Sequence, residues 1–511
     1  MHNYSANNQR IAKNALYLYV RMFITMLVGF YTTRVVLNAL GVSDYGVYDV
    51  MGGIIGMLTY INTLLAGGTA RFLTIALGKG NQKELNDTFA MGNSLGVLSS
   101  GIILLFGETI GLWFVNTHLN ISLDRMEAAN WVYQCALFSC CLTVMQTPYT
   151  ASIISHERMD IYAYMSIFDV VMKLFIVFML TWLDFDKLRL YAILIFAVNF
   201  LNIVIYRCIC IRLFEEAKLK FFFDKTKFNE MISYSGWNMV GAFANILNNY
   251  GLNILLNIFF CTIVNAARGI AMQVGNIVRQ FYSNFLIAFR PQITKYYAQG
   301  DINGMCMLIC NSSKYSSLML LCLIIPIAFN IDDFLQLWLG QKPEYTAWFV
   351  RIIMVQILYQ AIDTPLGIGI HAVGKMKLPN ITAAFFYLSV FPITWIALRM
   401  GAGPIVGYCV YLAFTPFILM VDMLILRSYS GFSIRRFLTF VIAPVTLIAL
   451  IGSLLSMIVV STITKEGIYF FILRVGISFA FTCGIVWIWG LPPNIRKVVV
   501  MRLPIIKNNY K

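Results

Sequence analysis

The sequence predicts an all-α protein that crosses a membrane about 14 times. Hydrophobic residues make up 59% of the 511 positions and charged residues only 12%, with a mean hydropathy of +0.75. Soluble globular domains carry about 25% charged residues. The apolar residues form runs of about 20, the length with which a helix satisfies its backbone hydrogen bonds across the bilayer core. A soluble globular protein is therefore excluded.

Each long apolar run is an expected span, and the polar stretches between the runs are short. The longest connections have about 20 residues, fewer than an independent domain needs. We therefore expect no soluble catalytic domain. The expected spans cover residues 14–36, 46–66, 88–115, 129–154, 161–183, 189–211, 233–258, 264–289, 308–329, 347–372, 379–399, 404–426, 437–461 and 468–490.

The basic residues lie mainly in the connections between the apolar runs. A net charge of +15 could reflect nucleic-acid binding, but short basic loops are better explained by anionic lipid headgroups and the positive-inside rule. With a cytoplasmic N-terminus, the cytoplasmic segments hold about 24 Lys and Arg residues and the opposite loops about 7. We expect both termini in the cytoplasm, membrane lipids as neighbours and no nucleic-acid partner.

Short motifs recur in the same order in the two halves of the chain. Thr147-Pro148 in the fourth span resembles Thr364-Pro365 in the tenth. Transporters are often built from two related bundles, so we expect two six-helix lobes followed by two additional helices. The expected parts are 1–212 for the first lobe, 213–232 for a cytoplasmic linker, 233–427 for the second lobe, and 428–511 for the last helices and a basic tail.

Three arginines lie on polar faces of the expected spans. Arg268 and Arg279 are eleven residues apart, which is about three helical turns, so both point the same way with about 16 Å between them along the axis. Arg21 lies on a polar face of the first span. Ionisable side chains at membrane depth usually face an aqueous cavity, and a guanidinium suits a phosphate because its planar fork donates two parallel hydrogen bonds. We predict that these arginines line a central cavity and bind a phosphate group.

Amide side chains form further polar stripes on otherwise apolar spans, and we predict that they contact sugar hydroxyls. The alternative is hydrogen bonding between buried amides of neighbouring helices, each bond worth about 1 kcal/mol. In the tenth span, Asp363 and His371 are candidates for coupling transport to an ion. The amide residues in this prediction are Asn238, Asn245, Asn249, Asn253, Asn265, Asn276, Gln356 and Gln360.

Other ionisable residues have simpler explanations. Asp169 and Lys173 lie four residues apart, so an i,i+4 ion pair can neutralise both. Asp422 lies near an expected span end, where snorkelling to the headgroups is sufficient. The 11 cysteines and four histidines match no zinc-site or catalytic spacing. We expect no metal, no cofactor and no enzyme activity.

Four stretches resemble a known family: RIAKN (10–14), TRVVLNALGVSDYG (33–46), NAARGIA (265–271) and PQITK (291–295). They are similar to Wzx-type polysaccharide flippases, which move O-antigen or capsule repeat units, especially those of the Bacteroides group. The resemblance covers essentially the whole chain. It implies membership of the multidrug/oligosaccharidyl-lipid/polysaccharide (MOP) exporter superfamily, which also holds the multidrug and toxin extruders and the lipid II flippase.

The resemblance implies a function in the bacterial inner membrane. Undecaprenyl-diphosphate-linked oligosaccharides, as used in lipopolysaccharide and other surface polysaccharides, would move from the cytoplasmic to the periplasmic leaflet by alternating access. The cationic cavity of the family is comparable with Arg21, Arg268 and Arg279 here. A glycan polymerase is a candidate partner. The alternative is a multidrug extruder of the same fold, which would favour a smaller pocket that is more acidic or aromatic.

Overall fold

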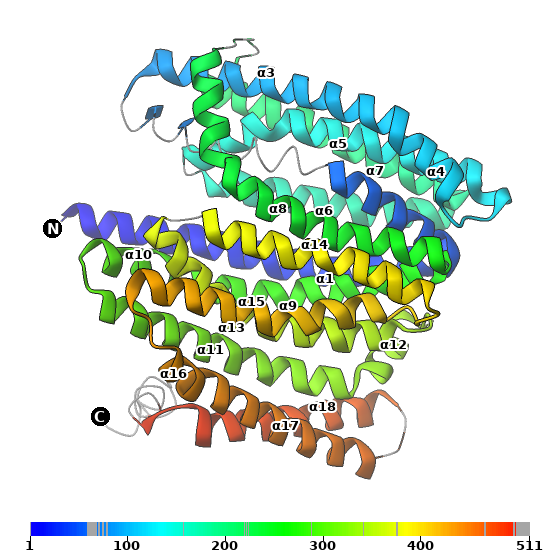
Figure 1. Ribbon diagram of the computed structural model, residues 1–511. Coiled ribbons are helices and arrows are strands. Elements are labelled where there is room, and N and C mark those ends of the chain that lie inside the picture. Colours follow the sequence, from blue (N-terminus) through cyan, green and yellow to red (C-terminus); the bar gives the residue numbers. More distant parts are fainter. Residues whose placement is uncertain are drawn as a thin grey trace, which may run out of the picture. The chain divides into compact units, whose positions relative to one another are not determined.

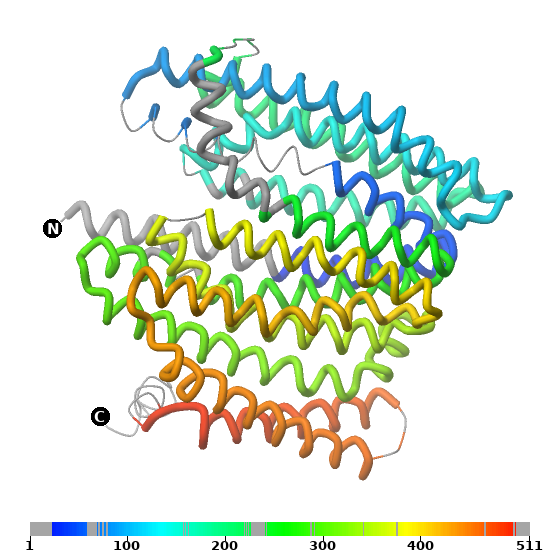
Figure 2. Tube along the Cα trace, viewed as in Figure 1, coloured from blue at the N-terminus to red at the C-terminus, as the bar shows by residue number. Residues whose placement is uncertain are grey.

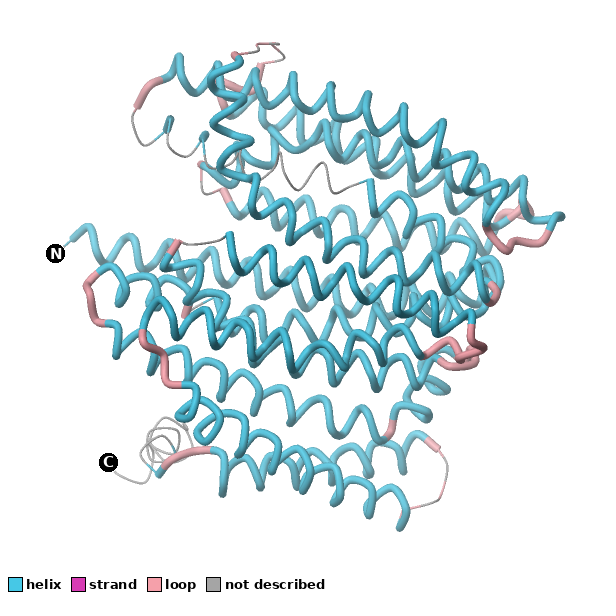
Figure 3. Tube along the Cα trace, viewed as in Figure 1, coloured by secondary structure: helices cyan, strands magenta, loops and turns pink. Residues whose placement is uncertain are grey.

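The computed structural model is helical throughout the part of the chain that it describes, and Figure 3 shows no strand there. Two predicted site residues, Arg21 and Asn238, have side chains outside the described set. Side chains of 2–22, 159, 162, 226–240, 242, 287 and 291 are likewise outside it. The described residues are 2–58, 69, 72–73, 76–77, 80–156, 158–218, 220, 222, 224–287, 289–340, 342–374, 377–463, 465, 467–493 and 496.

The chain divides into two compact units. Unit 1 comprises Met1–Gly269 and Tyr387–Pro404, and unit 2 comprises Ile270–Phe386 and Ile405–Lys511. The divisions fall inside two helices, α9 (Thr262–Ile287) and α14 (Lys377–Arg399). These units group α8 (Lys225–Phe259) and the start of α9 with the N-terminal helices. The sequence instead predicts that the second lobe begins at residue 233. The lobe boundaries stay a prediction.

Unit 1 is built around five helices that share an apolar core. Helix α5 packs against both α3 and α7, and α1 contacts α5 and α6 (Figure 1). Val50, Tyr133 and Leu137 are fully buried in this core. Its helices are α1 (His2–Leu58), α3 (Gln82–Phe106), α4 (Leu112–His118), α5 (Met126–Ser155), α6 (Met159–Trp182), α7 (Lys187–Leu213) and α8 (Lys225–Phe259), with short η1 (Gly107–Gly111) and η2 (Leu123–Arg125) turns.

Helix α1 joins the first two expected spans without a loop. Gly41 interrupts it with φ 79° and ψ 167°, a conformation that is essentially restricted to glycine. A Cβ at this position would meet no atom within 4 Å, so backbone conformation alone requires the glycine. The blue part of the tube changes direction at this point (Figure 2). The second half of α1 carries Asp49 into the interior of unit 1.

Unit 2 has its own core, formed by α11, α13 and α15 and completed by the last helices. Helices α17 and α18 both pack against α11, and Phe437, Val441 and Ile448 are fully buried among residues of α11, α13 and α15. Its remaining helices are α10 (Arg290–Ala298), α11 (Ile302–Phe329), α12 (Ile331–Leu339), α13 (Thr346–Val373), α15 (Val406–Ser430), α16 (Ile434–Phe437), α17 (Ala443–Thr462) and α18 (Ile468–Ile485), with π-helical turns η3 (Leu438–Ile442) and η4 (Val486–Gly490).

Eleven helices within the described residues are long and apolar enough to cross a membrane, so the expected multi-pass helical fold is confirmed. About 14 spans were expected, and three differences account for the smaller number. Helix α1 merges two of the expected spans. Helices α8 and α9 are not among the eleven, which were sought in the described residues alone.

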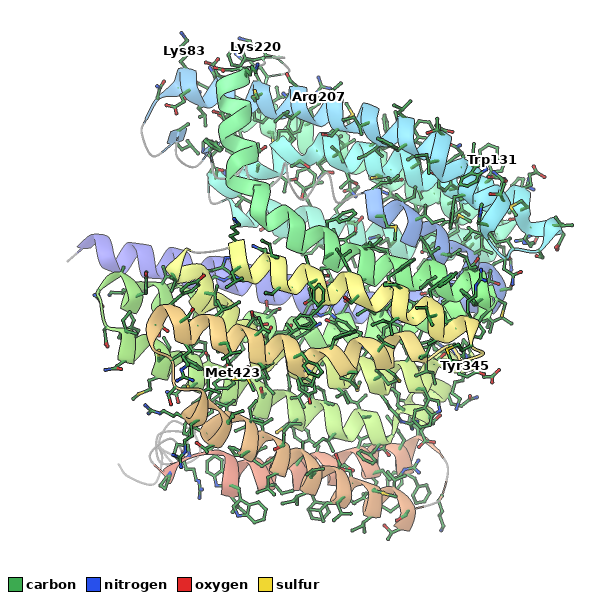
Figure 4. All side chains as sticks on the ribbon, in the orientation of Figure 1. Lys83, Trp131, Arg207, Lys220, Tyr345 and Met423 are labelled. Carbon is green, nitrogen blue, oxygen red and sulfur yellow. The ribbon has the colours of Figure 1, made fainter. Side chains whose placement is uncertain are left out.

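Three exposed side chains mark the two ends of the helices of unit 1. Lys83 and Lys220 lie near one end of its helices, whereas Trp131 lies toward the other end (Figure 4). The side chains of Lys83, Lys220 and Trp131 are all exposed. Lysine clusters suit an anionic headgroup surface, and tryptophan suits either membrane interface.

Candidate functional site

Helix α9 carries both of the described arginines that the sequence singled out. Arg268 belongs to unit 1 and Arg279 to unit 2. Because α9 is a regular helix between them, their eleven-residue separation keeps both on one face. Their surroundings are different, and each is described within its own unit.

Arg268 is held inside unit 1 by a carbonyl and a carboxylate. Only 4% of the residue is exposed. Its Nη2 donates to the backbone oxygen of Asn249 at 2.7 Å, and its Nη1 lies 3.5 Å from Oδ2 of Asp49. The carboxylate offsets the guanidinium charge, which would otherwise be very costly to bury.

Asp49 is fixed by contacts to its own backbone and to the backbone of α9. The amide of Asn253 donates from Nδ2 to the Asp49 carbonyl at 3.1 Å. A Cβ on Gly269 would lie 2.6 Å from Oδ1 of Asp49, so only glycine at this position lets the carboxylate approach α9 this closely. Asp49 was not among the predicted site residues. A carboxylate inside an apolar run was the signal that could have identified it.

Three asparagines of α8 and α9 form a closed hydrogen-bond network next to this pair. Asn253, Asn257 and Asn265 are completely buried. Asn265 donates from Nδ2 to the backbone and side-chain oxygens of Asn253, both at 2.8 Å, and Asn257 donates to Asn265 at 3.1 Å. The backbone N–H of Asn120 donates to Asn257 at 2.9 Å. The amides of Asn253 and Asn265 are thus engaged with protein, and they fasten α8 to α9.

A cavity of about 390 Å³ borders the Arg268–Asp49 pair within unit 1. Its volume falls in the range of small-molecule sites, which is about 300–1,000 Å³. Residues of α1, α5, α7, α8 and α9 line it, and they bring hydroxyl and amide groups toward the ion pair. The polar groups at its wall include Tyr48, Ser139, Thr143, Asn199 and Tyr250.

Arg279 is held in unit 2 by amides. Its Nε donates to Oε1 of Gln360 at 3.2 Å, and its Nη1 donates to Oδ1 of Asn276 at 3.0 Å. Gln360 in turn donates to the Tyr411 hydroxyl at 3.4 Å. No ion pair involving Arg279 is present among the described residues. Neutral amides orient the guanidinium without cancelling its charge.

Helices α13 and α15 place two carboxyl groups together in unit 2. Asp363 and Asp422 lie within hydrogen-bonding reach of each other. Two ionised carboxylates that lie close together repel each other. The snorkelling explanation for Asp422 is wrong, because α15 continues to Ser430 and leaves Asp422 about two turns inside the helix. His371 is exposed and lies eight residues beyond Asp363, about 12 Å along α13.

The remaining predicted residues divide by exposure. Gln356 is buried and donates to the Tyr408 carbonyl at 3.1 Å, which joins α13 to α15. Asn245 is exposed and accepts a hydrogen bond from Asn249 at 2.8 Å. Among the described residues, no group of three metal-ligating side chains is found, and the cysteines are free thiols.

Known proteins match this chain in fold rather than in sequence. No protein-family model and no curated protein matches it. The lipid II flippase MurJ, in an inward closed conformation, gives a TM-score of 0.69 at 12% identity over 92% of this chain and 98% of that chain. An inward-facing multidrug resistance MATE-family transporter of the MOP superfamily gives 0.56 at 12% identity over 81% and 98%. The Vibrio cholerae MATE transporter VcmN in its bent form gives 0.52 at 12% identity over 83% and 98%.

Proposed function

We propose that this protein is a flippase that carries a lipid-linked oligosaccharide, joined through a diphosphate, from the cytoplasmic to the periplasmic leaflet of the bacterial inner membrane. The observation that carries the proposal is Arg279, a cation oriented by Asn276 and Gln360 with no carboxylate partner among the described residues. The fold shared with MurJ, a lipid II flippase, supports the same substrate class.

The chemistry of Arg279 fits a phosphate oxygen. A guanidinium has five N–H donors, and two of those on Arg279 are used by the amides. The rest can donate charge-assisted hydrogen bonds, which are about twice as strong as bonds between neutral groups. Arg268 and Arg21 keep the phosphate-binding role as proposals, with Arg268 shielded by Asp49 in the arrangement observed.

The exposed amides suit sugar hydroxyls better than the buried ones do. Asn245 and Asn276 are exposed and Gln360 is half-buried, so all three can reach a ligand. The side chains of Asn253, Asn265 and Gln356 already form hydrogen bonds with neighbouring helices. Sugar contact is therefore proposed for Asn245, Asn276 and Gln360. Both termini in the cytoplasm, and a glycan polymerase as partner, remain sequence-based proposals.

The second candidate is a multidrug extruder coupled to protons. The observation that favours it is the Asp363–Asp422 pair, because an acidic site attracts organic cations and can exchange a proton for one. Tyr282 and Tyr411 of the same unit lie close enough to each other to interact electrostatically. Their rings would add aromatic surface to the acidic site. The same pair is equally compatible with proton coupling in a flippase.

Surface-glycan display in a flippase-null bacterial strain distinguishes the two candidates. We expect Arg279→Gln to lower display at least tenfold at normal membrane abundance, because the diphosphate loses its fork-shaped partner. The matched control is Arg427→Gln, which changes an exposed arginine in the last turn of α15 in the same unit. Full display by Arg279→Gln, together with drug resistance that depends on Asp363, would overturn the flippase and favour the extruder.

A further inference from the structure

The ion pair between Arg268 and Asp49 is longer than comparable pairs. Their closest N and O atoms are 3.5 Å apart, whereas Arg351 lies 2.6 Å from Asp332 and Arg474 lies 2.6 Å from Asp333. A charge-assisted N–H···O bond normally measures about 2.7–2.9 Å. The closest approach of Arg268 and Asp49 is therefore longer than a normal charge-assisted hydrogen bond.

Both partners also make contacts with other groups. The Asn249 carbonyl accepts a hydrogen bond from Nη2 of Arg268 at 2.7 Å. Asn253 holds the backbone of Asp49 at 3.1 Å, and the carboxylate rests against the bare backbone at Gly269. Oδ2 of Asp49 is buried and accepts no hydrogen bond among the described residues. The arrangement leaves a weakly bonded pair of opposite charges.

The unclosed pair lies at the wall of the 390 Å³ cavity, together with the hydroxyls of Ser139 and Thr143. An anion that enters this cavity would meet a guanidinium whose counter-ion is only loosely attached. A carboxylate beside the anion would repel it, because like charges brought together at a binding site cost several kcal/mol. Asp49 therefore opposes the binding that Arg268 promotes.

We propose that Asp49 is the release group of a phosphate site in unit 1: its carboxylate and the diphosphate of the cargo compete for Arg268, so that binding stays weak enough to reverse. The inference rests on the proposed function. A carrier must let its cargo go on the far side of the membrane, and a buried arginine needs a counter-ion when the cargo has left. Asp49 meets both requirements.

The test measures binding of inorganic pyrophosphate to the purified full-length protein in detergent by calorimetry. We expect Asp49→Asn to tighten the pyrophosphate Kd at least tenfold, and we expect the Asp49→Asn/Arg268→Gln double variant to lose that gain. Asp49→Glu keeps the charge on a longer side chain that can close on Arg268, so its affinity should be several-fold weaker than that of the wild type. The control is Asp169→Asn, an acid that pairs with Lys173 at 2.7 Å in the same unit and does not line the cavity.

A pyrophosphate Kd for Asp49→Asn that equals or exceeds the wild-type value overturns the inference. So does a double variant that still binds pyrophosphate as tightly as Asp49→Asn does, because it lacks Arg268. If Asp49→Asn is too unstable to purify, Asp49→Glu decides, and unchanged affinity in that variant counts against the inference. Glycerol 3-phosphate, which represents an ordinary phospholipid headgroup, should bind more weakly than pyrophosphate, and tighter binding would assign the site to membrane lipid instead. Glycan display by the Arg279→Gln variant tests the proposed function separately, so the two can fail independently.

Discussion

In unit 1 the α9 arginine faces a carboxylate and is almost fully buried, whereas in unit 2 the arginine three turns later faces two amides and is only half-buried. Both residues lie on the same face of one helix. The difference arises from what the neighbouring helices bring: Asp49 from α1 to Arg268, and Gln360 from α13 to Arg279. A buried pair keeps its charge balanced, while an amide-held arginine keeps its charge available.

The surrounding polar groups follow the same division. In unit 1, Asn253, Asn257 and Asn265 use their amides on one another. In unit 2, Asp363 and Asp422 bring two carboxyl groups together. The polar interior of unit 1 therefore combines an asparagine network with the cavity beside Arg268 and Asp49. That of unit 2 combines the amide-held Arg279 with two neighbouring carboxyl groups.

The largest expected contrast between the units is in stability after removal of each arginine. Arg268→Leu should lower the free energy of unfolding by about 3–5 kcal/mol, because it leaves Asp49 buried without a counter-charge. Arg279→Leu should lower it by about 1 kcal/mol, the value of its lost hydrogen bonds to neutral amides. Denaturant titration in detergent micelles measures both. Equal losses would show that the two arginines have equivalent surroundings after all.

The asparagine network gives the next largest contrast. Asn265→Ala should cost about 2–4 kcal/mol of unfolding free energy, since the buried amides of both Asn253 and Asn257 lose a partner and each loss costs about 1–3 kcal/mol. Asn276→Ala on the exposed part of the same helix should change stability by less than about 0.5 kcal/mol. The same denaturant titration measures both variants. An unchanged free energy of unfolding in Asn265→Ala would argue against a scaffold role for the asparagine network.

Gly41 tests whether the turn in α1 requires a glycine. Gly41→Ala should cost about 1–3 kcal/mol, because a residue with a Cβ is strained at this φ and ψ. Gly101→Ala is the control, since this exposed helical glycine also has no atom within 4 Å of its Cβ position and alanine favours a helix by about 1 kcal/mol. Thermal unfolding should shift downward in the first variant and upward in the second.

The smallest effect is expected where the two units are alike, at the carboxylates of their connecting segments. Burial raises the pKa of Asp332, but hydrogen bonds and charges from Lys342 and Arg351 bring it below the usual value. Burial likewise raises the pKa of Asp186, and the Arg189 backbone N–H and Arg125 lower it overall. A lowered folded-state pKa stabilises above the unfolded value of about 3.9 and loses that contribution as pH falls through the folded value.

Asp332→Asn and Asp186→Asn should therefore each cost less than about 1 kcal/mol at neutral pH, because these groups are partly exposed. The cost should begin to fall near pH ~3.9 and should disappear as pH falls through the lower folded-state pKa. Unfolding free energies measured from neutral to acidic pH check this in either unit. A variant that is most destabilising in acid would show that the sign of the shift is wrong.

Residues within one helix were predicted better than contacts between helices. The i,i+4 pair of Asp169 and Lys173 is confirmed at 2.7 Å, because both partners follow from one helical period. The shared face of Arg268 and Arg279 follows from the same period. Asp49 could not be assigned to Arg268 in this way, since the two are separated by more than 200 positions and periodicity says nothing about which helices meet.

Helix ends and joints account for the other differences. The expected gap after residue 36 is a kink at Gly41, because glycine can reverse the chain without a loop. Asp422 looked interfacial only because the expected span stopped at residue 426, whereas α15 ends at Ser430. The proline pairs correspond better: Thr147 and Thr364 each donate to the carbonyl four residues earlier, next to a proline inside a helix. The superposition of the two halves stays a prediction.

The position of α17 and α18 against α11 has a consequence for biosynthesis. Leu318 and Ile325 of α11 share their core with Val445 and Ile448 of α17 and with Val486, and Arg474 of α18 closes on Asp333 at 2.6 Å. These partners are translated after α11. The ribosome therefore releases α11 into the bilayer long before its packing surface is complete, and until then lipid or an insertion chaperone must cover that surface. A chain that stalls after α15 would present it permanently to the quality-control proteases of the membrane.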